Sequence, residues 1–167
     1  MLAILCTTYG DASVYAKESG GTEYEATWES LDSRLTPAWF QDAKFGIFIH
    51  WGLYSVPAWS PKGTYAEWYW HAKDGLPRKH AAAVARSEAV KEFHARVYGE
   101  EFAYEDFRPL FTCELFEPEQ WAKIFKRSGA RYVVLTSKHH DGYCLWPSAE
   151  ASQSFGTAWN SVESGPH

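Results

Sequence analysis

Residues 44–50 decide the fold, and they read Lys44-Phe45-Gly46-Ile47-Phe48-Ile49-His50. A short apolar run that ends in a polar residue predicts a strand buried on both faces, as strands of parallel sheets are. A second run of this kind reads Arg131-Tyr132-Val133-Val134-Leu135-Thr136-Ser137-Lys138 and leads into His139-His140-Asp141-Gly142. Helical patterns separate the two runs, so the sequence predicts a strand–helix–strand unit with parallel strands and a right-handed crossover.

Two helices and one long loop are predicted around and after the first strand. Residues 37–43 begin with a proline, which suits the first turn of a helix. Residues 79–97 are rich in alanine, carry apolar residues at helical spacing and end at Gly99, where a C-terminal cap is expected. Residues 51–77 are rich in Trp, Tyr, Pro and Gly, and we expect them to form a long functional loop.

The clearest helical pattern covers residues 118–128. It begins with a proline, has basic residues near its end, and is followed by Gly129 at the position of a left-handed cap. Trp121, Ile124 and Phe125 fall on one face of this helix. The pattern therefore predicts that this face packs into the core.

Length, charge and cysteine content exclude several classes of protein. The chain has 167 residues, enough for one domain but short of the roughly 250 residues of a closed eight-stranded β/α barrel. The net charge of −5, and the absence of any stretch near the roughly 20 apolar residues of a membrane span, argue against nucleic acid and membrane as partners. The three cysteines have neither metal-site spacing nor the number that a disulfide framework needs.

The first 27 residues differ in character from residues 28–167, which we take as one segment of a folded domain. Leu2 to Cys6 are apolar, and Val14-Tyr15-Ala16 resembles a small-residue cleavage site, but no basic residue precedes the apolar run. Residues 1–27 are therefore either a leader, a weak or truncated export signal, or a disordered cytoplasmic N-terminus. An export signal would favour a secreted, periplasmic or lysosomal location, and the sequence does not decide between these alternatives.

Both predicted strands end in histidine: His50 follows the first strand, and His139 and His140 follow the second. Because the carboxyl ends of parallel strands meet at one edge of a sheet, we expect three imidazoles to converge there. Three imidazoles suit either a divalent metal or a neutral polyol, since imidazole both donates and accepts hydrogen bonds. The absence of a His-x-His pair argues against the metal, whereas Glu67 beside Trp68 adds an acceptor and a flat ring that suit a sugar.

Four blocks of this chain resemble the α-L-fucosidases, glycoside hydrolase family 29. The first block is Lys44–Pro57 and the second is Tyr65-Ala66-Glu67-Trp68-Tyr69. The third block is Tyr132–Trp146, and the fourth is Trp159-Asn160-Ser161-Val162 followed by Gly165-Pro166. The resemblance extends from about Trp28 to Pro166, with the blocks in the order of the family.

The resemblance implies a fold, an activity and a set of ligands. The fold would be α/β, a partial (β/α)8 TIM-like barrel of which only the first strands and helices are present. The activity would be exo-hydrolysis of terminal α-L-fucose with retention of configuration. The residues that would line the fucose pocket are His50, Glu67, Trp68, His139 and His140. No cofactor is implied, the partners would be fucosylated oligosaccharides or glycoproteins, and oligomerisation of the full-length protein stays open.

Retaining hydrolysis needs a carboxylate nucleophile and a second carboxyl group roughly 5 Å away. The resemblance implies that both lie beyond His167, in a longer protein of which this chain is a fragment, inactive alone, with unpaired sheet edges. Asp141 matches a structural turn of the family pattern rather than the nucleophile. Two alternatives remain: a non-catalytic fucose-binding relative, and a metal-dependent hydrolase on the same barrel.

Overall fold

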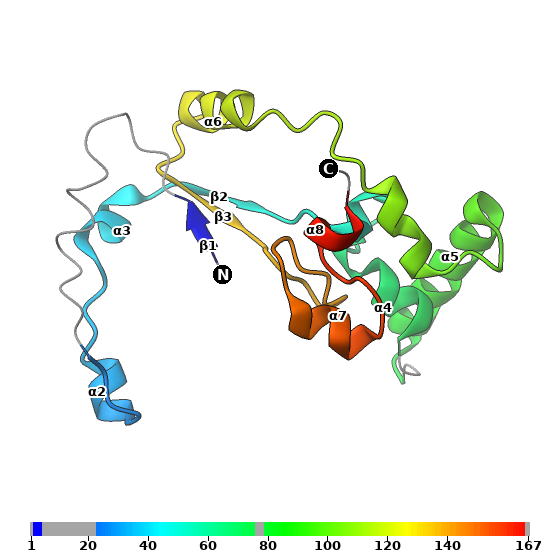
Figure 1. Ribbon diagram of the computed structural model, residues 1–167, viewed down its shortest axis with the longest axis horizontal. Helices are drawn as coiled ribbons and strands as arrows, with labels where there is room; N and C mark the ends of the chain where they lie inside the picture. Colours follow the sequence, from blue (N-terminus) through cyan, green and yellow to red (C-terminus); the bar gives the residue numbers. More distant parts are fainter. Residues whose placement is uncertain (1, 5–22, 76–78, 166–167) are drawn as a thin grey trace. The chain divides into compact units, whose positions relative to one another are not determined.

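The computed structural model describes residues 2–4, 23–75 and 79–165 (Figure 1). Most of the predicted leader or disordered segment therefore lies outside the described residues. The described chain divides into two compact units. Of the described residues, the first unit contains 2, 49–116 and 135–165, and the second contains 3–4, 23–48 and 117–134.

The strands form a small sheet in the order β1-β3-β2, where β1 is Leu2–Ile4, β2 is Gly46–Ile49 and β3 is Tyr132–Leu135. The backbone N–H of Arg131 donates to Phe45 O at 2.9 Å, and the N–H of Thr136 donates to Ile49 O at 2.9 Å. The partner residue thus advances along β2 as the chain advances along β3, so the two strands are parallel. Both predicted strands are confirmed, and with the helices they make the fold α/β.

Three helices belong to the second unit: α2 (Trp28–Asp32), α3 (Ala38–Ala43) and α6 (Pro118–Arg127). The predicted helices over 37–43 and 118–128 are confirmed, and Gly129 has the positive φ of +87° that its capping position requires. Helix α3 lies against β3, because Phe40 is 5.5 Å from the ring of Tyr132. That ring also covers Gly46, where a Cβ would lie 2.2 Å from it. Only glycine permits this approach.

Two predictions about burial are wrong in this unit. No residue of α6 is buried, and Ile124 is 53% exposed on the face that was expected to pack into the core. Strand β2 is not buried on both faces, because Phe48 is 59% exposed. On the apolar stripe of α6, Trp121 and Phe125 are half-buried, so the exposure is greatest at Ile124. Amphipathic patterning predicts an element and its apolar face, but not whether a partner for that face is present.

The first unit is helical apart from the ends of β2 and β3 (Figure 1). Its helices are 3-10 helices η1 (Leu53–Ser55), η2 (Ala66–Trp68) and η3 (Tyr104–Leu110), and α-helices α4 (Tyr69–Asp74), α5 (Ala81–Tyr98), α7 (Ala149–Phe155) and α8 (Ser161–Ser164). The predicted helix over 79–97 is confirmed as α5, which is followed by Gly99 at φ +95°. The predicted long loop over 51–77 is wrong in part, because η1, η2 and α4 occupy much of it. None of the helices within the described ranges has the length and apolar character needed to cross a bilayer.

Aromatic side chains form the core of the first unit. Its buried members are Leu53, Tyr54, Tyr69, Ala72, Val90, Tyr104, Phe107, Phe111, Tyr143 and Trp159. Arg108 ties the last part of the chain to this core: its guanidinium donates to Thr157 Oγ1 at 2.7 Å and to Ala158 O at 2.8 Å, and lies over the Trp159 ring at 5.7 Å.

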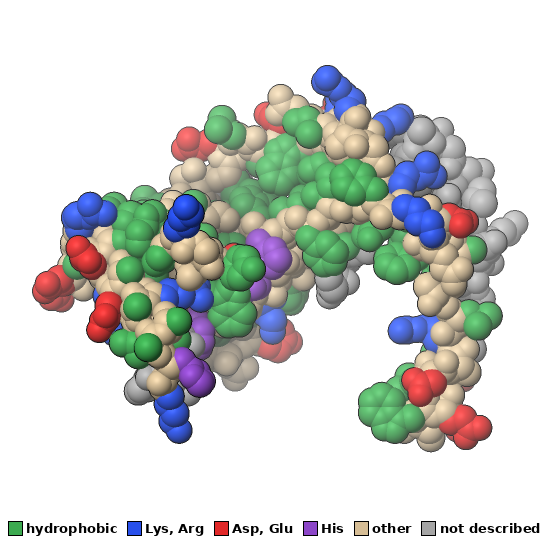
Figure 2. Space-filling view, turned by 180° about the vertical axis from the view of Figure 1, so that it is seen from behind, with side chains coloured by type: hydrophobic (Ala, Val, Ile, Leu, Met, Phe, Trp, Pro, Cys, Tyr) green, Lys and Arg blue, Asp and Glu red, His purple; other side chains and the backbone are tan. Residues whose placement is uncertain are grey.

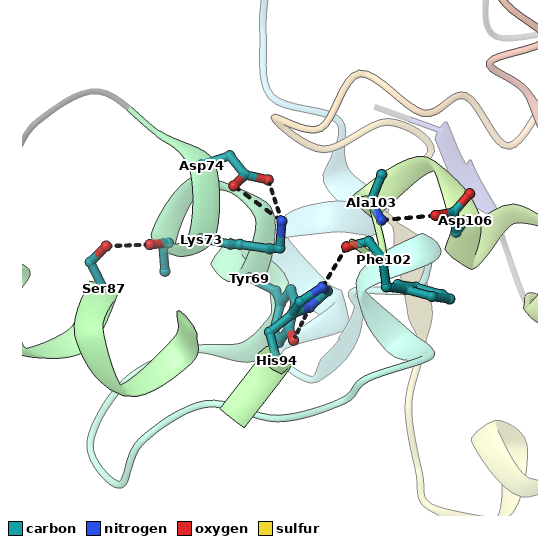
Figure 3. A network of polar contacts seen from close by, with 9 residues as sticks. Tyr69, Lys73, Asp74, Ser87, His94, Phe102, Ala103 and Asp106 are labelled. Carbon is teal, nitrogen blue, oxygen red and sulfur yellow. Dashed lines mark hydrogen bonds and ion pairs between the residues drawn. The ribbon is translucent and has the colours of Figure 1, made fainter. Parts of the chain in front are cut away.

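Helix α4 is fixed against α5 by buried polar contacts (Figure 3). His94 Nε2 lies 2.7 Å from Phe102 O, and because a carbonyl only accepts, this nitrogen carries the proton. Nδ1 then accepts from Tyr69 Oη at 2.9 Å. Ser87 Oγ donates to Ala72 O at 2.6 Å, one turn further along α4. These contacts hold α4 in place, and with it the side chains on its surface.

Candidate functional site

The three histidines that follow the strands lie together in the first unit. The ring centroids of His50 and His139 are 5.3 Å apart, and those of His139 and His140 are 4.3 Å apart. The chain brings them together because β2 and β3 are parallel neighbours, so their carboxyl ends meet. His50 and His140 are exposed, whereas His139 is half-buried between them. In the space-filling view histidine side chains reach the surface beside hydrophobic ones (Figure 2).

Trp68 and Glu67 join this histidine cluster from η2. The Trp68 ring meets His140 edge to face at 3.5 Å between centroids and His139 at 5.6 Å. Glu67 is half-buried, and both its charge and its backbone interact with His139. The five residues predicted as sugar ligands are therefore neighbours, although their role as ligands stays a prediction.

The environment of His139 keeps its imidazole neutral. Burial lowers the pKa of His139, and the neighbouring His140 and His50 lower it further, while Glu67 opposes them. A neutral imidazole offers one donor and one acceptor, which is what a sugar hydroxyl can match. Its Nδ1 is buried and has no hydrogen-bond partner within the described structure. This atom is a polar group that a bound hydroxyl or water could satisfy.

Asp141 organises the turn that follows the histidines. Its carboxylate accepts from Tyr104 Oη at 2.8 Å and from the Tyr143 N–H at 3.1 Å, and its carbonyl accepts from Trp159 Nε1 at 2.8 Å. The side chain is buried, and burial raises the pKa of this carboxyl group. Gly142 follows with φ +73°, and a Cβ there would lie 2.7 Å from the Phe155 ring. These contacts give Asp141 the geometry of a structural turn.

Tyr54 is a neighbour of the histidine cluster that the sequence did not single out. Its ring lies 5.4 Å from that of His139, and its Oη is buried with no hydrogen-bond partner in the described part of the chain. Burial raises the pKa of this phenol, and the charges of Asp141 and Glu67 raise it further. Tyr54 therefore stays protonated, and its O–H is available as a donor on the inner side of the site.

A cavity of about 250 Å³ lies beside this cluster and is lined by Glu67, Trp70, His71, Asp74, Gly75, His140 and Asp141. Of the five predicted ligands, only Glu67 and His140 border it. Trp70, His71 and Asp74 were not predicted as site residues, because residues 51–77 were expected to form a loop. These residues lie at i+3, i+4 and i+7 from Glu67, the spacing of one face of a helix. This helical spacing could have predicted that they face one side.

Metal binding finds no support in the described residues, where no group of three or more His, Cys, Asp or Glu side chains has an arrangement that could hold an ion. Two of the three cysteines, Cys113 and Cys144, are described and are free thiols. The third, Cys6, lies outside the described residues. The side chains of this site are imidazoles, carboxylates, a phenol and indoles, which can donate and accept hydrogen bonds.

Imidazoles, a carboxylate and a flat indole lie at the carboxyl ends of two parallel strands, the edge where α/β enzymes of the barrel class have their active sites. Residues 12–167 match the model of the α-L-fucosidase family, and the chain belongs to this family. It is 49% identical over 144 residues to an α-L-fucosidase of Dictyostelium discoideum, a match that covers 86% of this chain and 28% of the relative. It is 46% identical over 145 residues to human plasma α-L-fucosidase, covering 87% of this chain and 27% of the relative.

Solved structures of α-fucosidases are also similar to this chain. The crystal structure of Thermotoga maritima α-fucosidase in complex with fucose superimposes with a TM-score of 0.69 at 44% identity, covering 86% of this chain and 32% of that one. The complex of the same enzyme with a mechanism-based inhibitor gives a TM-score of 0.67 at 45% identity, with the same coverage. The chain spans less than a third of the length of the curated relatives named above.

Proposed function

We propose that this chain forms the sugar-recognition part of an exo-acting α-L-fucosidase that removes terminal α-L-fucose from glycoconjugates with retention of configuration. The observation that carries the proposal is that His139 contacts both His50 and His140, and that Trp68 contacts His139 and His140. The three imidazoles and Glu67 bind the hydroxyls of fucose, and the indole packs on its apolar face. Membership of the α-L-fucosidase family supports this assignment.

The carboxylates for the two displacement steps come from elsewhere in the enzyme. Asp141, the carboxylate next to the histidines, is buried and already accepts hydrogen bonds from Tyr104 and Tyr143, so its oxygens are engaged in the turn. The match to this chain covers 28% and 27% of these two curated relatives, which leaves room for both groups in the rest of the enzyme. In this proposal residues 28–167 are the N-terminal portion of a (β/α)8-like catalytic domain.

A chimera tests the proposal in the setting of a whole enzyme. The 144 residues of the Dictyostelium enzyme that match this chain are replaced by the corresponding residues of this chain. We expect the chimera to hydrolyse an aryl α-L-fucoside, and proton NMR to show the α-anomer of fucose released first. In the chimera, His50→Ala or His139→Ala should lower kcat/KM by about tenfold or more, because each removes hydrogen bonds of about 0.5–1.5 kcal/mol each.

His80→Ala is the matched control, since His80 is an exposed histidine at the start of α5. It should leave kcat/KM within about twofold of the parent chimera. A folded chimera that binds L-fucose in calorimetry without hydrolysing the fucoside would make this chain part of a non-catalytic fucose-binding relative instead. Changes below twofold in both His50→Ala and His139→Ala would remove these residues from the pocket.

A further inference from the structure

Tyr54 and His139 each have a buried polar atom that makes no hydrogen bond to any described residue. These atoms are Tyr54 Oη and His139 Nδ1, and the centroids of the two rings are 5.4 Å apart. A buried hydroxyl or ring nitrogen without a partner costs free energy, because it has lost its hydrogen bonds to water. Two such atoms on neighbouring rings indicate an interaction that they share.

A tyrosine and a histidine already form such a hydrogen-bonded pair elsewhere in the first unit (Figure 3). Tyr69 Oη donates to His94 Nδ1 at 2.9 Å, and the centroids of these two rings are 5.9 Å apart. His94 carries its proton on Nε2, which donates to Phe102 O at 2.7 Å. The rings of Tyr54 and His139 are closer together than those of Tyr69 and His94, so their separation permits the same hydrogen bond.

The phenol of Tyr54 and the imidazole of His139 have complementary roles. Tyr54 is 4% exposed, and burial raises the pKa of its phenol, so the oxygen keeps its hydrogen. The backbone of Trp51 opposes this shift, as an N–H close to the oxygen does, and an N–H can engage a lone pair but cannot accept the phenol hydrogen. Burial and the neighbouring imidazoles lower the pKa of His139, so its ring is neutral and has one bare nitrogen that can accept this hydrogen.

Two neighbouring groups could compete for these atoms. The Asp141 carboxylate raises the pKa of Tyr54 by its charge, but it already accepts two hydrogen bonds. The backbone of Glu67 raises the pKa of His139, as a carbonyl close to a ring N–H does. If that N–H were at Nδ1, the hydrogen of Tyr54 would stay unpaired inside the protein. A bare Nδ1 lets one hydrogen bond satisfy both buried atoms.

We propose that Tyr54 is a positioning residue for His139: its hydroxyl hydrogen is directed at Nδ1 and keeps the ring proton on Nε2. The buried edge of this half-buried ring carries Nδ1, so Nε2 lies on the edge that is left for a substrate. The inference rests on the proposed function, because the Nε2–H is then the group that donates to a hydroxyl oxygen of fucose. Tyr54 does not contact the sugar in this arrangement, and it acts only through His139.

The position of the ring proton of His139 can be measured by NMR without any sugar. The full 167-residue chain is labelled with ¹⁵N in its histidines and studied at about pH 8, where histidine is neutral. Long-range ¹H–¹⁵N correlations distinguish a bare ring nitrogen from a protonated one, and His139→Ala assigns the signals. We expect a bare Nδ1 and a protonated Nε2 in His139, as in His94, which serves as the internal reference.

Tyr54→Phe removes the hydroxyl and keeps the ring. It should lower the ratio of the Nε2–H form to the Nδ1–H form of His139 about two- to tenfold, the effect of one hydrogen bond. Tyr98→Phe is the matched control, because the Tyr98 ring packs in the same unit against His94 and Phe107. It should leave the ratio in His139 unchanged.

Titration with L-fucose connects the ring proton to the proposed function. Tyr54→Phe should raise the Kd for L-fucose about two- to tenfold in the parent chain, because His139 then spends less time in the donating form. In the His139→Ala background the same change should raise the Kd by less than about 1.5-fold, since a residue that acts through another has no further effect once that residue is removed. Tyr98→Phe should leave the Kd unchanged in both backgrounds.

The outcomes separate the inference from the proposed function. A protonated Nδ1 in the parent chain overturns the inference and leaves the proposed function intact, since the Glu67 carbonyl would then be the partner of this nitrogen. An unchanged ratio in Tyr54→Phe, or an equal loss of affinity in both backgrounds, overturns it as well. If L-fucose moves no histidine signal of the parent chain, the proposed function is contradicted, and the role of Tyr54 in fucose binding falls with it.

Discussion

The two units of this chain use their aromatic and aliphatic side chains in opposite ways. The first unit buries Phe107 completely, within a core of Tyr, Phe and Trp side chains. The second unit leaves Phe45, Phe48 and Ile124 about half exposed, on a strand and a helix that were predicted to be covered. Similar apolar patterns thus give a core in one unit and an open surface in the other. Whether an apolar face is buried depends on whether a second layer of structure packs against it.

The comparison predicts its largest effect for truncation of a phenylalanine. Phe107→Ala should lower the free energy of unfolding by about 3–5 kcal/mol, because it leaves a cavity in a packed core. Phe48→Ala removes the same atoms from a side chain that is 59% exposed. This variant should change the free energy of unfolding by no more than about 0.5 kcal/mol. Urea unfolding followed by circular dichroism measures both. Equal losses for the two variants would show that the two units do not differ in this way.

A second prediction concerns the polar part of the same core. Tyr104→Phe removes the hydroxyl that donates to the buried Asp141 carboxylate, and should lower the free energy of unfolding by about 1–3 kcal/mol. Because this carboxylate organises the turn after His139 and His140, the NMR signals of both imidazoles should move as well. Tyr65→Phe, an exposed tyrosine, is the control and should change the stability by less than about 0.5 kcal/mol. If the imidazole signals do not move in Tyr104→Phe, Asp141 does not position His139 and His140.

These contacts show how far the sequence alone could lead. The convergence of His50 with His139 was predictable, because it follows from two parallel strands that both end in histidine. The cavity wall around Trp70 and His71 was not recognised, because the dense Trp and Tyr content of that stretch obscures the helical period of α4. The exposure of Ile124 was not predictable either: a helix pattern identifies an apolar face without identifying its partner.

A third prediction uses the pH dependence of the first unit. Burial lowers the pKa of His94, although the hydrogen bond of its ring to Phe102 O opposes this shift. The unfolded chain takes up a proton near pH 6.5 and the folded chain only at lower pH. Stability should therefore fall as the pH drops below about 6.5.

Unfolding free energies at about pH 7.5 and 5.5 measure this loss. In His94→Gln the decrease between these values should be smaller than in the parent chain, although the variant is less stable at both. Some decrease should remain, because the pKa of His139 is lowered too. An identical decrease in parent and variant would show that His94 does not titrate differently in the two states.

The smallest effect is expected at Ile124 on α6, and it tests whether further elements cover this residue in the whole enzyme. Ile124 is 53% exposed, so Ile124→Ser should change the unfolding free energy of this chain by about 0.5 kcal/mol or less and should reduce binding of a hydrophobic dye.

In the chimera, where further barrel elements are proposed to cover α6, the same change should cost about 1–3 kcal/mol, since it places an unpaired hydroxyl in an apolar contact. Ala122→Ser, at an exposed position of the same helix, controls for helix propensity in both proteins. An equally small cost in the chimera would mean that this face stays open in the whole enzyme, and that the barrel part of the proposal is wrong.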